Sequence, residues 1–459
     1  MMDESLVVVA IDFGTVHLGY TFLLKGSKEF YSCCIDGTSE RIPNIVLVSP
    51  GDTVDYLGEN AKKKYVSLLQ NGSANNWSLF EGYKVSLHKS RLTRDLQISD
   101  VRGHKRSALL VIGKTIKFLK QEAEKSIRKV MTNIQSQNIK WVLTVPALWS
   151  DCAKQFMREA ASLAGIERNR LMLVLEPEAA SLYCLDKPVN VVQNDDNMAT
   201  SVALLTRQKY ILADIGGGTT DICIHEVLIA HSLREIHRST GDIKGGMNIN
   251  EDFIQLIKNI VGTHAWMKFK NESPEYFELM NDFELKKRQF SIPMELMKEF
   301  IQLKQDHVTC RKAFNTKTEN IPTMQEHDTA IRLPYDLKDI VQTECKTSFE
   351  ELLKVSDYSD GLRFFKDKLI IKPAVMLELF ESTLQSILHH LRDLYQQMKN
   401  KGEDINVIMF VGGFSESKYF QERVKLEISS LGLQVVIPGN GSLAVLKGAA
   451  IMGFFTQVT

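Results

Sequence analysis

The stretch Ala213-Asp214-Ile215-Gly216-Gly217-Gly218-Thr219 decides the fold, because it places an aspartate and three glycines at the end of an apolar run. Tyr210 to Asp214 predicts a strand, the glycines predict a turn, and Thr220 to Val227 predicts the returning strand. Glycine lets the backbone adopt positive φ, so that successive N–H groups can converge on phosphate oxygens. The stretch therefore predicts one side of a phosphate-binding site.

The same arrangement occurs near the N-terminus as Ile11-Asp12-Phe13-Gly14-Thr15. It lies between the apolar runs Leu6 to Asp12 and Gly19 to Leu24, which again predict two strands. One glycine turn alone would be weak evidence, since an ordinary tight turn explains it equally well. Two copies indicate two related half-domains whose turns hold one nucleotide between them.

Asp12 and Asp214 are the candidate metal-binding residues, because each ends an apolar strand just before a glycine. A carboxylate buried at such a place is costly unless a cation is close. Mg²⁺, held through water molecules, is the cation that suits oxygen ligands beside phosphates. Thr15 and Thr219 add hydroxyl groups that can contact phosphate or orient water.

Two further segments are weaker candidates. Gly412-Gly413 follows a predicted strand and precedes a helix, so that N–H groups could face a nucleotide there, although a plain turn fits as well. Glu284, Lys287 and Ser291 are spaced to share one face of a helix. That face could hold adenine and ribose, and the alternative is an ordinary solvated face.

Composition limits the class of protein. The chain has 459 residues, which suits two large lobes, and its formal net charge of +0 provides no general attraction for nucleic acid. No run is long enough to span a bilayer, and no secretory signal precedes the first strand. The seven cysteines form no CxxC pair, which favours a reducing cytoplasm over a disulfide framework or a zinc site.

Several motifs together resemble the ATPase domain of the 70-kDa heat-shock protein family. In chain order they are Ile11–Thr15, Thr144–Ala147, Glu176–Ala180, Asp214–Asp221, Gly245–Gly246, Glu284–Ser291 and Val411–Ser415. Val145–Trp149 and Lys154–Ala161 are similar to the heat-shock protein 12 branch in particular. The resemblance implies an α/β, two-lobed actin-like ATPase fold, made of duplicated ribonuclease H-like domains with a nucleotide cleft between the lobes.

The resemblance also implies a domain organisation. Residues 1–205 are expected to form lobe I and residues 206–440 lobe II, with a helix in residues 441–459 that returns to lobe I. Residues 293–372 are expected to be an insertion that carries contacts with partner proteins. Residues 187–200 are polar and predict a loop. We expect no C-terminal peptide-binding domain, and therefore no groove for an extended peptide client.

The family's roles can be assigned to matching residues, with ATP or ADP and Mg²⁺ as the implied ligands. Asp12 and Asp214 would hold the hydrated Mg²⁺, and Glu176 would position a water molecule bound to it. The catalytic group would comprise Lys84, Glu176, Asp214 and Thr219, with Lys89 as a rival for the lysine. The nucleotide contacts would be Gly14, Thr15, Gly216, Gly217, Gly218, Thr219, Gly245, Glu284, Lys287, Ser291, Gly412 and Gly413.

Three departures from the family pattern bear on activity. Val16-His17 stands where the family has a threonine and an aromatic residue, Phe414 replaces a serine, and Ser442 replaces an aspartate. They leave two functions open: a slow Mg²⁺-dependent ATPase, or a nucleotide-gated interaction protein that hardly hydrolyses ATP. A sugar kinase is a third class, but no catalytic aspartate facing a sugar pocket can be placed. An actin-like filament rests on fold analogy alone.

Overall fold

In the computed structural model the chain forms two compact units. Unit 1 comprises residues 1–245, 391–415 and 432–459, and unit 2 comprises residues 246–390 and 416–431. The lobe boundaries expected from the sequence stay a prediction. The structure describes residues 5–32, 39–89, 92–186, 189–191, 200–202, 205–229, 232–305, 311, 314–315 and 327–454.

Unit 1 contains two large sheets, of which the first includes the N-terminal hairpin. Its strand order is β11-β10-β1-β2-β3, and β4 also pairs with β2. β1 runs parallel to β10 and antiparallel to β2, while β10 runs parallel to β11. The strands are β1 (Val7–Phe13), β2 (His17–Leu24), β3 (Tyr31–Ser32), β4 (Ile42–Pro43), β10 (Ile139–Val145) and β11 (Leu171–Leu175).

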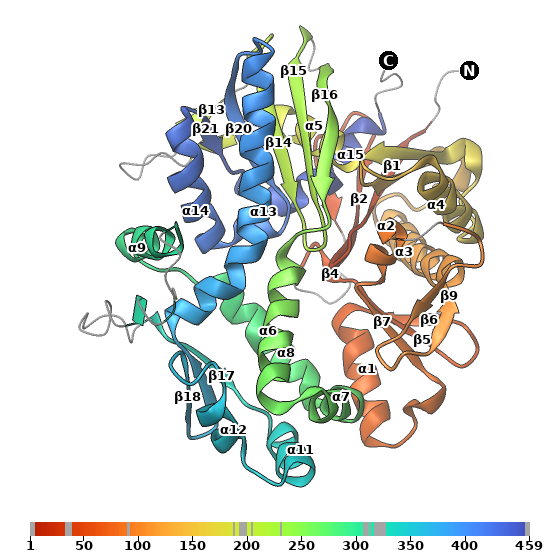
Figure 1. Ribbon diagram of the computed structural model, residues 1–459. Helices are drawn as coiled ribbons and strands as arrows, with labels where there is room; N and C mark the ends of the chain where they lie inside the picture. The colour runs from red at the N-terminus through yellow and green to blue at the C-terminus, as the bar shows by residue number, and fades with distance from the viewer. Residues whose placement is uncertain are drawn as a thin grey trace. The chain divides into compact units, whose positions relative to one another are not determined.

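The second sheet repeats this order. It reads β13-β12-β21-β20-β14-β15-β16, in which β14 runs parallel to β20 and antiparallel to β15 (Figure 1). Thus β21-β20-β14-β15-β16 matches β11-β10-β1-β2-β3 position by position, which confirms the predicted duplication. The strands are β12 (Val189–Val191), β13 (Thr200–Val202), β14 (Lys209–Ile215), β15 (Thr220–Val227), β16 (Leu233–Asp242), β20 (Ile405–Val411) and β21 (Gln434–Val436).

The helices around the duplicated strands also come in the same order along the chain in both copies. α3 precedes β10 and α13 precedes β20; α4 separates β10 from β11, and α14 separates β20 from β21. α5 follows β11 and α15 follows β21. The bounds are α3 (Ala108–Val130), α4 (Asp151–Leu163), α5 (Glu176–Asp186), α13 (Pro373–Asn400), α14 (Lys418–Ile428) and α15 (Ala444–Met452).

β1 forms because nearly every residue in it is apolar, whereas β15 combines apolar residues with polar ones such as Asp221 and His225. All residues of β1 and β15 are buried, a pattern typical of central strands that are covered on both faces. α3 begins at Ser107, whose side chain caps the helix, and it turns Ile112, Ile116 and Leu119 into the core.

Helix α15 lies against β1 and α5 in unit 1 (Figure 1). Its residues Leu446 and Ala449 share an apolar cluster with Ala10 and Ala179. Gly448 faces Ala179 so closely that a Cβ atom there would overlap the Ala179 carbonyl oxygen. This close approach explains the alanine- and glycine-rich sequence of the helix.

A smaller region of unit 1 joins β5 (Ile45–Val48), β6 (Val54–Leu57) and β7 (Ser78–Glu81) in the order β6-β5-β7. Helix α1 (Gly58–Gln70) packs against β5 and β6. The remaining short elements of the unit are η2 (Tyr83–Val85), α2 (Ser86–Lys89), β8 (Gln97–Ser99) and β9 (Lys105–Ser107).

Unit 2 is mainly helical and contains the small sheet β17-β19-β18. This sheet lies within the segment expected to be an insertion, where the sequence predicted a helix over Glu295 to Gln305 and little else. The elements are α6 (Gly246–Val261), α7 (Thr263–Glu272), α8 (Glu275–Gln289), α9 (Met294–Gln305), β17 (Thr329–Arg332), α11 (Tyr335–Cys345), α12 (Phe349–Val355), β18 (Leu362–Phe365) and β19 (Lys368–Ile371).

The loop expected over residues 187–200 is wrong at both ends. β12 occupies residues 189–191 and β13 begins at residue 200, because these valine-containing ends add to the edge of the second sheet, where Val191 pairs with Val436. Residues 187, 188 and 192–199 lie outside the described residues.

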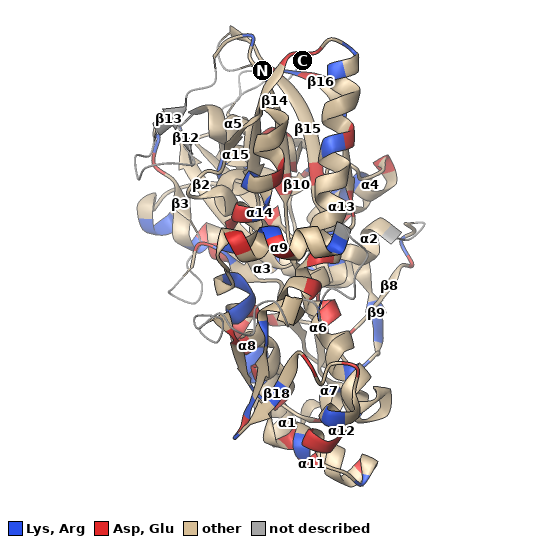
Figure 2. Cartoon of the chain, turned by 60° about the vertical axis from the view of Figure 1, so that its left-hand side comes forward, with Lys and Arg blue, Asp and Glu red and all other residues tan. Residues whose placement is uncertain are grey.

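The hydropathy of the helices and the distribution of charged residues agree with what the composition predicted. No helix in the described part of the chain is both long enough and apolar enough to cross a membrane. Lysine, arginine, aspartate and glutamate are interspersed along helices such as α9 and α13 (Figure 2), so neither sign dominates there.

We expect Gly448→Ala to lower the stability of the protein. In an ordinary helix this change gains about 1 kcal/mol, but here the new methyl group must push α15 away from α5, at a cost of about 1–3 kcal/mol. Thermal unfolding should show a lower melting temperature. Gly439→Ala is the control, because its Cβ would meet nothing within 4 Å. Equal melting temperatures for the two variants would contradict the proposed packing constraint.

Candidate functional site

The two glycine turns, far apart in sequence, lie against each other. A Cβ atom at Gly218 would lie 2.6 Å from Cγ2 of Thr15, and one at Gly217 would overlap the side chain of Val16. Both turns belong to unit 1. The duplicated hairpins therefore bring Gly14–Val16 and Gly216–Gly218 to one place, as the sequence predicted.

Two other predicted glycines pack around the second turn. A Cβ atom at Gly245 would lie 2.6 Å from the carbonyl oxygens of both Gly216 and Gly217. Gly412 has φ +87 and its backbone approaches Asp214 so closely that a side chain would overlap the carboxylate. Only glycine suits that position, since it needs both positive φ and the missing side chain. Gly413 follows it beside Arg41.

Asp12 lies at the end of β1 and is 5% exposed. Its Oδ1 accepts a hydrogen bond of 2.9 Å from the Thr144 hydroxyl, and its Oδ2 lies 3.7 Å from Nη2 of Arg41. Thr144 belongs to one of the motifs that carry the family resemblance, whereas Arg41 belongs to none of them. These contacts fix the carboxylate and partly neutralise it.

Asp214 occupies the equivalent position in β14 and is 8% exposed. Burial raises the pKa of its carboxyl group well above the usual range, and the nearby charges of Glu176, Asp221 and Asp12 raise it further. Arg41 opposes this increase. The site therefore concentrates negative charge before any ligand arrives.

Asp221 belongs to this group, although the sequence analysis gave it no role. Burial and the charge of Glu176 raise its pKa to about 7, against the effect of Lys84. Its Oδ1 is buried and accepts no hydrogen bond from the described residues. Its position at the end of the motif Asp214–Asp221, on β15 opposite Asp214, was the signal that could have identified it.

Lys84 and Glu176 form a buried ion pair, with 2.8 Å between Nζ and Oε1. Burial raises the pKa of Glu176 while Lys84 opposes the increase. The Lys84 ammonium also lies 5.2 Å from the ring of Trp149, whose indole N–H donates to Nε2 of His88 over 2.8 Å. This geometry favours Lys84 over Lys89, which ends α2 and whose side chain lies outside the described residues.

The charges can be compared with those of a magnesium ion. In the fully ionised state, the four interacting carboxylates among the described residues here (Asp12, Glu176, Asp214, Asp221) face two cations (Lys84, Arg41), so 4 − 2 leaves a formal excess of two negative charges. The raised pKa values of Glu176, Asp214 and Asp221 show that this state is unfavourable without a further cation. A divalent cation would neutralise that excess. No group of three or more His, Cys, Asp or Glu side chains in the described ranges could hold a metal ion alone. Water and phosphate oxygens would have to complete its coordination.

In unit 2, Glu284 and Lys287 lie on one face of α8, as predicted. Nζ of Lys287 donates to Oε2 of Glu284 over 2.6 Å, to Oδ1 of Asn250 over 2.8 Å and to the carbonyl oxygen of Gly246 over 2.9 Å. Burial alone would raise the pKa of Glu284, but Lys287, Arg288 and Asn250 together lower it to about 2. Glu284 is therefore an ionised acceptor held in one orientation.

Ser291 does not continue this face, and that prediction is wrong. Helix α8 ends at Gln289, and Phe290 has the extended values φ −60 and ψ 127. The Phe290 ring packs 5.6 Å from that of Phe380 and 5.4 Å from that of Tyr419, and Pro293 follows soon after. Burial of this ring and the proline nearby end the helix before Ser291.

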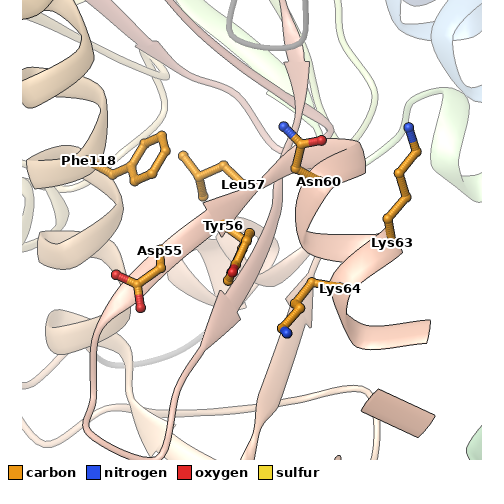
Figure 3. Close-up of a pocket in the computed structure, with 7 residues that line it drawn as sticks. All are labelled: Asp55, Tyr56, Leu57, Asn60, Lys63, Lys64 and Phe118. Atoms are coloured by element: carbon orange, nitrogen blue, oxygen red, sulfur yellow. The ribbon is translucent and has the colours of Figure 1, made fainter. Parts of the chain in front are cut away.

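A pocket of about 490 Å³ occurs elsewhere in unit 1, between β6, α1 and α3 (Figure 3). None of the predicted nucleotide residues lines it. Phe118 and Leu57 form an apolar side, and Lys63 and Lys64 project from α1. Its lining residues are Asp55, Tyr56, Leu57, Asn60, Lys63, Lys64 and Phe118.

Comparison with known proteins identifies relatives that agree with the family predicted from the motifs. The family model described as Hsp70 protein matches residues 82–322. Heat shock 70 kDa protein 12A of Mus musculus is 28% identical over 98% of this chain and 69% of its own length. The Homo sapiens 12A protein is 27% identical over 98% of this chain and 70% of its own length, and the Homo sapiens 12B protein is 27% identical over 97% and 68%. The predicted resemblance to that branch is confirmed.

We expect Asp214→Asn to raise the melting temperature of the ligand-free protein. The raised pKa means that the ionised carboxylate costs stability at pH values above that pKa, and the amide removes the cost. With an unfolding entropy of about 2.1 cal/mol/K per residue, each kcal/mol relieved should raise the melting temperature of this 459-residue chain by about 1 °C. The difference from the wild type should be largest at pH 8 and shrink at lower pH, where the wild-type carboxyl takes up a proton. A variant that melts lower at pH 8 would contradict this electrostatic description.

Proposed function

The chain belongs to the Hsp70 family, and from this premise we propose that it binds MgATP at the paired glycine turns and hydrolyses it slowly. As a member of the family it is an ATP-binding protein. Magnesium dependence, hydrolysis, and lobes that open and close with the nucleotide state belong to the proposal. The observation that supports it most is the contact between the turns Gly14–Val16 and Gly216–Gly218, each beside a buried aspartate.

The residues of the site can supply position and charge. Main-chain N–H groups of the two turns would bind phosphate oxygens, and the hydroxyls of Thr15 and Thr219, which are 7% and 9% exposed, would bind phosphate or orient water. Lys84 would bring positive charge to the transferred phosphoryl group. Glu176 would help to position a water molecule bound to magnesium.

The reaction is attack of a water oxygen on the γ-phosphorus of ATP, which forms one P–O bond and breaks the bond to ADP. When bound, magnesium would supply positive charge to the phosphate oxygens, with Asp12 and Asp214 holding its water ligands. The chain itself contributes no covalent step. We therefore expect slow turnover that depends on how completely the site excludes bulk water.

The second function is a nucleotide-gated interaction protein with little hydrolysis. One contact favours it: the side chain of Val16, an apolar residue where the family has a hydroxyl, lies directly against Gly217. Phe414 is buried and Ser442 lies in the turn Gly441–Leu443, so the other two departures also fall near the predicted nucleotide loops of unit 1. Under this proposal residues 293–372 would carry the partner contacts. A cytoplasmic location also remains a proposal.

Single turnover separates the two functions. Purified protein loaded with labelled MgATP and desalted should convert its bound ATP to ADP over time, because the site holds the nucleotide while water attacks. Asp214→Asn should bind less nucleotide and lose its response to Mg²⁺ while remaining folded. Bound ATP that stays intact would support the nucleotide-gated alternative, and unchanged Mg²⁺ dependence in the variant would reject Asp214 as a metal residue.

We expect Glu284→Ala to raise the dissociation constants of ATP and of adenosine by about tenfold or more, since an ionised hydrogen-bond acceptor contributes about 1.5–3 kcal/mol. Equilibrium titration of both ligands measures this effect. Glu278→Ala is the matched control, because Glu278 is an exposed residue of the same helix. If both variants bind adenosine as the wild type does, the adenosine site lies elsewhere.

A further inference from the structure

Arg41 lies among three of the predicted nucleotide-binding elements, although no sequence motif includes it. Its Nη2 is 3.7 Å from Oδ2 of Asp12. A Cβ atom at Gly14 would lie 3.7 Å from the same Nη2, and a Cβ atom at Gly413 would lie 3.6 Å from Nη1. One guanidinium group is therefore close to the first glycine turn, to the last glycine turn and to a predicted metal residue, all within unit 1.

The backbone around Arg41 is fixed to the first glycine turn. The next residue, Ile42, is fully buried and pairs with Leu18 through β4 and β2. Asn44 then donates from its main-chain N–H to the carbonyl oxygen of Val16 and from its side chain to that of Gly14, both over 2.7 Å. Arg41 thus directly precedes a segment that is hydrogen-bonded to the first glycine turn.

The hydrogen-bonding capacity of the guanidinium is poorly used in the ligand-free protein. Its Nε is buried and has no hydrogen-bond partner among the residues that the structure describes. The 3.7 Å between its Nη2 and Oδ2 of Asp12 is the distance of an ion pair and is longer than a hydrogen bond. The side chain is 17% exposed, so water reaches only part of it. An arginine offers five N–H donors in a planar fork, which matches the oxygens of a phosphate.

Resting on the function proposed above, we propose that Arg41 binds the phosphate chain of the nucleotide and supplies positive charge there even when magnesium is absent. In the ligand-free protein Arg41 neutralises Asp12. When a nucleotide binds, the guanidinium turns to the phosphate oxygens between Gly14 and Gly413, and Asp12 becomes available to the hydrated metal. Nucleotide binding by this chain is consequently only partly dependent on magnesium.

The competing explanation is that Arg41 serves only as the structural counter-ion of Asp12. The two explanations differ in which ligands respond. A phosphate-binding arginine affects ADP and ATP but not adenosine, which has no phosphate. A structural counter-ion affects all three alike, because its loss disturbs the site as a whole.

The test measures dissociation constants of ADP and adenosine by equilibrium titration, in excess EDTA and in excess Mg²⁺. The variants are Arg41→Gln, which removes the charge, and Arg41→Lys, which keeps the charge without the planar fork. Arg94→Gln is the matched control, since Arg94 pairs with Glu159 on the surface and its side chain is 76% exposed. Thermal unfolding of each variant establishes that it is folded.

We expect the wild type to bind ADP in EDTA and Arg41→Gln to weaken that binding at least tenfold, with a smaller loss in Mg²⁺ and an unchanged constant for adenosine. Arg41→Lys should fall between the two, and Arg94→Gln should match the wild type. Equal ADP constants for wild type and Arg41→Gln in EDTA overturn the proposal, as does a parallel loss of adenosine. Wild-type protein that binds ADP only with Mg²⁺ also overturns it and leaves the proposed function intact. Failure to bind ADP or ATP even with Mg²⁺ defeats the proposed function itself.

Discussion

Buried negative charge at the ends of two duplicated strands is the constraint on which the rest of the site depends. Asp12 and Asp214 lie where apolar strands stop, and Glu176 and Asp221 add to the same field. Carboxylates cannot remain ionised in such surroundings without compensation. Three features of this chain compensate the charge. They are the ion pair between Lys84 and Glu176, the glycine turns that expose N–H groups, and the Arg41 guanidinium beside Asp12.

The duplicated part of the fold could be predicted from sequence, because its signals are local. Strand, aspartate, glycine turn and strand follow one another within a few residues, and α4 and α13 show clear apolar stripes between recognisable ends. The edge strand β12 could not be predicted, since it pairs with β21, more than two hundred residues away. β13 then pairs with β12, so it depends on the same distant contact, which the local pattern does not show. The sheet β17-β19-β18 could not be predicted either, because each of its strands is only four residues long and shows little periodic pattern.

The site was predictable where a residue type and its neighbours carry the chemistry together. The contact between the turns agrees with the expectation drawn from the motifs, and the role of Lys84 as the catalytic lysine stays a prediction. Arg41 gave no signal, because an arginine two residues before a proline is unremarkable until the chain folds it against Asp12. For Ser291 the sequence pattern was misleading. Its spacing from Glu284 and Lys287 suggested one helical face, but the helix ends before Ser291 because Phe290 is buried.

The position of α15 also matters for how the protein is made. The face of β1 that carries Val8 and Ala10 is covered by a helix from the other end of the chain. During synthesis β1 emerges from the ribosome with that apolar face bare, and the face stays bare until the chain has been translated as far as α15. Contacts so distant along the chain slow folding and expose aggregation-prone surface in the interim. By its topology, this chain completes the core of its first sheet only when α15 has been made.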